Sequence, residues 1–108
     1  GVCYGNLILT AGQLGINPKS GEIVKGGIEA ETRQALDNIR AILLAAGTSM
    51  SQVVKTTVFL RDMSDFTRMN TTSADYFSPP FPARSTIQVA ALPKGGAVEI
   101  EAIAVIPE

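Results

Sequence analysis

The side chains most able to do chemistry lie in two stretches near the C-terminus. The first is 81–86 (FPARST) and the second is 99–101 (EIE). The planar guanidinium of Arg84, placed after a proline corner, can hold a carboxylate through two parallel hydrogen bonds. Glu99 and Glu101 are two residues apart and therefore share one face of a strand, where a carboxylate can hold a water or relay a proton. This pattern favours a site for a small acidic substrate.

The same residues have a plainer interpretation. Glu99 and Glu101 can be ordinary charges on a solvated sheet face, with Arg84 as the partner of a surface ion pair. Ser85 and Thr86 have no base to activate them, so their hydroxyls are expected to donate hydrogen bonds. Spacing alone leaves both interpretations open.

Several other kinds of site are disfavoured by composition. The chain has no histidine and one cysteine, so the common nucleophile–base pairs and zinc clusters are not available and we expect no metal. Lys94 precedes two glycines, but the phosphate-loop spacing and a following helix are missing, which indicates a solvated turn. Cys3 has no evident cationic neighbour that would lower its pKa, so we interpret it as a small strand residue.

Length and charge set further bounds. The 108 residues fit a single domain spanning 1–108, and 45% apolar residues against 18% charged predict a folded globule. A net charge of −1 gives no field that favours nucleic acid as a partner. No apolar stretch reaches the ~18 residues of a membrane span, and a lone cysteine suits a reducing, cytoplasmic compartment. The N-terminus reads as a chain that starts inside a strand.

Periodicity and turn residues predict the elements that must position these side chains. Apolar residues recur at three- and four-residue steps over 28–46, which indicates one amphipathic helix, and Asp62 or Ser64 can cap a second helix that runs to about Phe77. Branched or alternating residues predict strands at 2–4, 6–12, 53–60, 83–91 and 97–106, with a brief strand at 22–24. The order suggests an α+β two-layer domain, a mixed sheet with both helices on one face.

The last of these strands carries information about assembly. Apolar side chains point to both of its faces, as in Ile100 and Ile103. If the helices cover only one face of the sheet, another copy of the chain must cover the other. We therefore expect self-association into a closed ring.

Six stretches along the chain together form a recognisable pattern: 10–13 (TAGQ), 17–18 (NP), 53–58 (VVKTTV), 81–85 (FPARS), 89–95 (VAALPKG) and 99–104 (EIEAIA). With them the chain resembles the RidA subgroup of the Rid (YjgF-like) family, the reactive intermediate deaminases. The resemblance covers nearly the whole chain, and the combined run from Phe81 to Ala104 is its most specific part.

The resemblance implies a chorismate-mutase-like fold that forms a homotrimer, a central barrel with helices outside and clefts between subunits. It implies a 2-iminobutanoate/2-iminopropanoate deaminase that converts imines and enamines such as 2-aminoacrylate to the 2-keto acid and ammonia without a cofactor. Arg84 would anchor the substrate carboxylate and Glu101 would orient or protonate through a water. Asn70 and Thr86 would add orienting hydrogen bonds, and Gly12 and Gln13 would form the cleft wall.

The chain departs from the family pattern in two places. The family's Gly-Pro-Tyr-Ser-Gln-like stretch, whose tyrosine lines the pocket, would precede Gly1, so we expect the N-terminal strand to be truncated. Ala11 stands where a serine is common.

Two other functions are alternatives to the deaminase. One is an endoribonuclease or translation inhibitor, which needs a basic groove, and the other is a non-catalytic binding or chaperone-like trimer.

Overall fold

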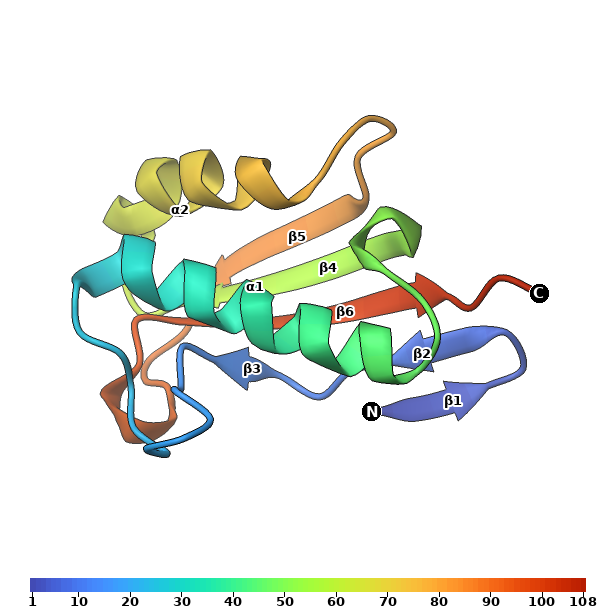
Figure 1. The fold of residues 1–108 in the computed structure, drawn as a ribbon. Helices are drawn as coiled ribbons and strands as arrows, with labels where there is room; N and C mark the ends of the chain where they lie inside the picture. The colour runs from blue at the N-terminus through green and yellow to red at the C-terminus, as the bar shows by residue number, and fades with distance from the viewer.

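One mixed β-sheet carries two α-helices on a single face (Figure 1). The computed structural model describes all residues, 1–108. Its helices are α1 (Gly27–Ala45) and α2 (Phe66–Ser73), and short 3-10 turns at Met63–Asp65 and Ala74–Tyr76 flank α2. Its strands are β1 (Val2–Tyr4), β2 (Leu7–Leu9), β3 (Gln13–Leu14), β4 (Val53–Leu60), β5 (Ala83–Gln88) and β6 (Val98–Val105).

The last strand of the chain lies at the centre of the sheet. The strand order is β1-β2-β6-β4-β5, and β3 pairs with β6 beyond the end of β2. Only β4 and β5 pair in parallel; the other pairs are antiparallel. The α+β, two-layer architecture with a mixed sheet and both helices on one face is therefore confirmed.

The core lies between this sheet and the helices. Along β6 the buried side chains alternate with half-buried ones, because successive side chains of a strand point to opposite faces. Helix α1 lays its buried stripe over them. A buried carboxylate also joins the two layers: Glu31 Oε1 accepts a hydrogen bond from the Ala97 amide at 2.8 Å. The main core residues are Ala35, Leu36, Ile39, Leu43, Val58, Leu60, Met69, Val98, Ile100, Ala102 and Ala104.

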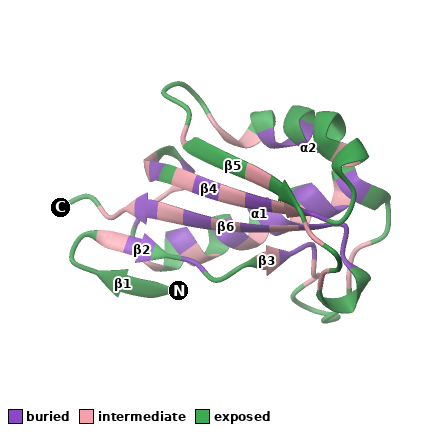
Figure 2. Ribbon diagram, turned by 180° about the vertical axis from the view of Figure 1, so that it is seen from behind, coloured by how far each residue is buried: buried purple, intermediate pink, exposed green.

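The other face of the sheet has no helix over it (Figure 2). We call it the helix-free face, and the strand registers place on it Leu9, Phe59, Ile87, Glu99, Glu101 and Ile103. Leu9 is 40% exposed and Ile87 is 47% exposed. Apolar side chains on both faces of β6 are thus confirmed, whereas a second copy that covers this face stays a prediction.

Three of the expected strands differ from the structure in extent, and the second helix, expected to run to about Phe77, ends at Ser73. The expected strand at 6–12 is two short strands, because the Thr10 hydroxyl accepts a hydrogen bond from the Ala102 amide and interrupts the ladder between β2 and β3. The expected strand at 22–24 is reduced to one bridge between Ile16 and Ile23. The strand expected at 83–91 ends at Gln88, where β4 also ends. None of the helices combines the length and the apolar composition that crossing a membrane requires.

Candidate functional site

A cavity of about 420 Å³ lies between α2 and the sheet. Leu36, Val58 and Ile100 supply apolar wall, and α2 supplies the polar side chains of Asn70 and Ser73. The remaining lining residues are Thr56, Ala74, Phe77, Phe81, Pro82 and Arg84. The cavity is thus mainly apolar with a few polar groups, which is the usual character of a small-molecule site.

Arg84 reaches this cavity because of its position on β5. The parallel pairing of β5 with β4 sets Arg84 opposite Thr56, whose side chain is buried on the helix-covered face. Its Nη1 donates a hydrogen bond to Asn70 Oδ1 at 2.6 Å, and its Cζ lies 5.4 Å from the centroid of the Phe66 ring. Arg84 takes part in none of the three ion pairs of the structure. Within the chain, Arg84 is therefore held by neutral groups and makes no ion pair.

Thr86 lies two residues further along β5 and points to the same face as Arg84. Its Oγ1 is buried and has no hydrogen-bond partner. A buried hydroxyl without a partner is uncommon in proteins, because leaving it unpaired costs about 1–3 kcal/mol. Thr86 therefore carries an unused hydrogen-bonding group on the same face of β5 as Arg84, outside the residues that line the cavity.

Glu101 lies on the opposite side of the sheet from Arg84. It pairs with Thr57 of β4 on the helix-free face, as Glu99 does with Phe59. In the same region Lys55 Nζ donates a hydrogen bond to Ser85 Oγ at 2.9 Å. The structure therefore brings Arg84 and Asn70 together, places Thr86 on the same face of β5 as Arg84, and separates Glu101 from them within one chain.

Gly12 lies against a glutamate of the helix-free face, whereas Gln13 pairs with Ile100 of β6. A Cβ at Gly12 would lie 2.7 Å from the carboxyl carbon of Glu99, so the glycine leaves room for that side chain. Gln13 Nε2 donates a hydrogen bond to the Ala11 carbonyl at 3.2 Å. Glu99, and not Glu101, is the carboxylate beside the expected cleft wall. The motif at 99–101 indicated both glutamates, but the contact that distinguishes them depends on the pairing of β3 with β6.

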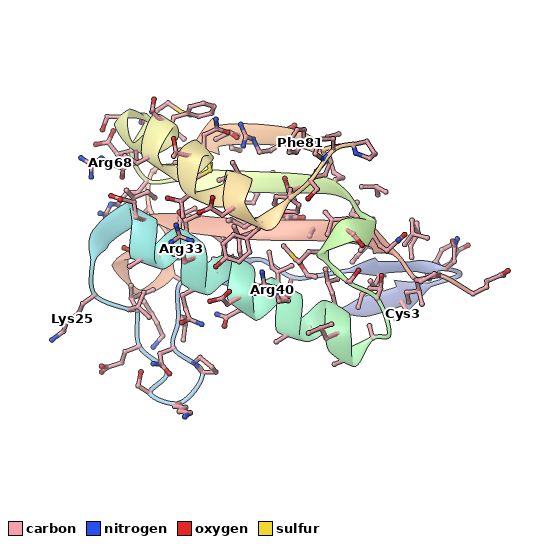
Figure 3. All side chains as sticks on the ribbon, turned by 45° about the horizontal axis from the view of Figure 1, so that its top comes forward. Cys3, Lys25, Arg33, Arg40, Arg68 and Phe81 are labelled. Atoms are coloured by element: carbon pink, nitrogen blue, oxygen red, sulfur yellow. The ribbon has the colours of Figure 1, made fainter.

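The shifted pKa values lie away from the cavity. Burial and a hydrogen bond to Asp37 raise the pKa of Tyr76, while a hydrogen bond from the Ser64 amide lowers the pKa of Asp62. The cations of the helical layer, Arg33, Arg40 and Arg68, are spread along α1 and α2, and Phe81 lies at the far end of α2 from Arg68 (Figure 3). No three His, Cys, Asp or Glu side chains are grouped to hold a metal ion.

Comparison with known proteins agrees with this architecture. The family model described as endoribonuclease L-PSP matches residues 1–106. A 2-iminobutanoate/2-iminopropanoate deaminase of Bos taurus is 56% identical over 91% of this chain and 72% of its own length. The deaminase of the same name from Escherichia coli is 50% identical over 97% of this chain and 84% of its own length. The crystal structure of RidA from an Antarctic Psychrobacter superposes with a TM-score of 0.93 at 48% identity and covers 97% of this chain and 85% of that one.

Proposed function

Because the chain belongs to the endoribonuclease L-PSP family, we propose that it is an imine deaminase acting on 2-iminobutanoate, 2-iminopropanoate and enamine tautomers such as 2-aminoacrylate. Water and the imine give the 2-keto acid and ammonia, and the reaction consumes no cofactor. The relatives with deaminase names support the reaction, and the single unpaired, exposed Cys3 suits a cytoplasmic location.

The observation that carries this proposal is the set of groups that surround the Arg84 guanidinium. Its guanidinium lies at a largely apolar cavity, is held by neutral groups and has no carboxylate partner. An arginine presents five N–H donors in a rigid plane, and one hydrogen bond to Asn70 leaves donors free for a substrate carboxylate. We propose that Thr86 Oγ1, which is unpaired and on the same face of β5, gives the substrate a further hydrogen bond. These groups fix the acid end of the substrate while the imine carbon stays accessible.

The chemical step requires a group that handles protons. Water adds to the electrophilic imine carbon, and the carboxylate passes one water proton to the imine nitrogen, which gives a carbinolamine. The carboxylate then takes the hydroxyl proton of the carbinolamine and delivers it to nitrogen as the C–N bond breaks, which releases the keto acid and ammonia. The spacing of the motif indicated both Glu99 and Glu101, and the family resemblance assigned this role to Glu101. Glu99 faces the same way and lies against Gly12, the expected cleft wall, so the geometry favours Glu99 as the proton carrier.

The two halves of this site can meet only in an assembly. Arg84 lies on the helix-covered face of β5, an edge strand, and both glutamates lie on the helix-free face. A substrate held by Arg84 of one subunit can therefore meet Glu99 only on a neighbouring subunit. This requirement, together with the uncovered apolar side chains, supports the homotrimer that the family resemblance implies.

The test is a coupled assay. A serine/threonine dehydratase generates 2-aminoacrylate in the presence of the protein, and the release of ammonia and pyruvate is followed above the spontaneous rate. We expect wild type to accelerate the release and Arg84→Ala to reduce kcat/KM on the order of a hundredfold or more, because the charge-assisted contact with the substrate carboxylate is lost. A wild-type rate in Arg84→Ala would contradict the proposed mechanism.

The two glutamates form a matched pair in the same assay. Glu99→Gln should reduce kcat on the order of a hundredfold, because the amide cannot accept the proton. Glu101→Gln, two residues away on the same face, should retain most of the activity. The reverse result would assign the proton to Glu101 instead.

The alternatives have their own outcomes. Ribonuclease activity that survives further purification and is lost in Arg84→Ala would favour the endoribonuclease that the family name describes; the net charge of −1 and the lack of histidine give no support to it. A protein that binds keto acids through Arg84 and accelerates no hydrolysis would be a non-catalytic binding or chaperone-like trimer.

A further inference from the structure

Two neutral side chains of α2 hold the guanidinium of Arg84. Phe66 and Asn70 are four residues apart, so they lie on the same face of the helix. The Asn70 amide oxygen accepts the 2.6 Å hydrogen bond from Nη1, and the Phe66 ring lies under the guanidinium carbon at 5.4 Å. Phe66 is 36% exposed although it is a large apolar residue, and it does not line the cavity.

The contacts of Phe66 and Asn70 with the Arg84 guanidinium, which we call the clamp, differ chemically from an ion pair. An aromatic face attracts a cation through its quadrupole and uses none of the N–H donors. An amide oxygen uses one donor and adds no negative charge. The guanidinium is therefore fixed in orientation, keeps its full charge and keeps a donor edge for a carboxylate. An aspartate at the position of Asn70 would hold Arg84 as firmly and would compete with the substrate.

We propose that Phe66 is a positioning residue, whose ring, together with the Asn70 amide, orients Arg84 without neutralising it so that the guanidinium is preorganised for an anionic substrate. This inference rests on the proposed role of Arg84. It assigns Phe66 a function that the sequence motifs did not indicate. It also gives Asn70 a role through Arg84, where the family resemblance predicted a direct bond to the substrate.

The test measures binding of a carboxylate without turnover. 2-Oxobutanoate, a keto acid product, is titrated into wild type, Phe66→Leu, Phe66→Tyr and Asn70→Asp by calorimetry. We expect Phe66→Leu to weaken binding roughly two- to fivefold, the range of an exposed cation–π contact, and Phe66→Tyr to restore it. Asn70→Asp should weaken binding at least about tenfold, because a new carboxylate occupies the guanidinium.

Matched measurements separate positioning from folding and from the reaction itself. Each variant should melt close to the wild-type Tm, since both side chains are exposed. The neutral amide of the same keto acid should bind wild type and Phe66→Leu alike. In the coupled assay, Phe66→Leu should raise KM more than it lowers kcat.

The outcomes distinguish this inference from the proposed function. Equal binding of 2-oxobutanoate by Phe66→Leu and wild type, or equal loss in Phe66→Leu and Phe66→Tyr, would overturn the clamp. If wild type binds the acid through Arg84 with the expected variant effects and accelerates no hydrolysis, the deaminase proposal fails and the clamp stands. A wild type that neither binds the acid nor accelerates hydrolysis overturns both.

Discussion

Two threonine hydroxyls are buried without a hydrogen-bond partner, and they lie in different parts of the molecule. Thr86 is on β5, two residues from Arg84 and on the same face of the strand, and Thr32 is in α1, where it is fully buried. An unsatisfied hydroxyl destabilises the folded state, and a methyl group of similar size does not carry that cost. Comparing the two threonines therefore tests whether the Thr86 hydroxyl, and not the Thr32 hydroxyl, contributes to substrate binding.

We predict opposite effects of Thr86→Val on stability and on binding. The free energy of unfolding should stay equal or rise by up to about 1 kcal/mol, because the lost hydroxyl made no hydrogen bond in the free protein. KM for the imine should rise several-fold if the hydroxyl bonds the substrate. Thr32→Val is the control and should change stability alone; unchanged KM in Thr86→Val would remove Thr86 from the site.

The residue types of the site could be identified from the sequence, whereas their arrangement could not. Arg84 and the EIE motif were recognisable because few residue types can hold an acid or relay a proton. Whether Arg84 and Glu101 share a face depends on the register of β4 with β5 and with β6, which no single strand encodes. The role of Phe66 depends on how α2 packs over β5, so its apolar type indicated only the buried side of a helix.

Between the two helices, Tyr76 forms a junction that should respond to pH. Its hydroxyl lies 2.9 Å from Asp37 Oδ1 and 3.2 Å from the Arg33 carbonyl oxygen, both in α1, and Arg40 lies 4.9 Å from its ring centroid. Burial, followed by the hydrogen bond to Asp37, raises the pKa of Tyr76 above the ordinary value of 10.0. The neutral phenol is therefore favoured in the folded state.

This shift fixes the direction of the pH effect. Below pH 10 the stabilising contribution of the neutral Tyr76 phenol is fully present. Above pH 10 the phenol loses its proton in the unfolded chain before it does so in the folded chain, so the free energy of unfolding falls as pH rises through the folded pKa of Tyr76. The free energy of unfolding of Tyr76→Phe should be about 0.5–1 kcal/mol below that of wild type at pH 8. Between pH 9 and 11 it should decline less than the wild-type value does. Urea titrations at each pH measure this. An identical decline in Tyr76→Phe and wild type would contradict the assignment.

At the level of elements, long periodic segments were predicted well and short ones were not. The amphipathic pattern at 28–46 matches α1, and the β-branched run at 53–60 matches β4, because both patterns extend over many residues. The second helix, expected to run to Phe77, is an eight-residue α2 between 3-10 turns. The split of the early strand could not be predicted, because it depends on a hydrogen bond between Thr10 and Ala102, which are 92 residues apart.

For the whole molecule, the decisive feature is the apolar helix-free face. Its exposed side chains include Val2, Tyr4, Leu9 and Ile87, which lie on three different strands of one sheet. Exposed apolar surface of this kind marks an interaction site, and the catalytic proposal requires the same contact because it divides Arg84 and Glu99 between subunits. Assembly and activity should therefore be lost together.

We predict that Ile87→Lys converts a three-chain particle to single chains and abolishes imine hydrolysis, while the circular dichroism spectrum stays native. Ile87 is 47% exposed, so the lysine fits a folded chain, but a charge in a covered apolar contact costs several kcal/mol. Leu44→Lys, at a 60% exposed site on α1, is the matched control and should keep both mass and activity. Light scattering gives the mass and the coupled assay gives the rate. A trimeric and fully active Ile87→Lys would show that this part of the face is not the contact, and an active monomer would show that one chain completes the site alone.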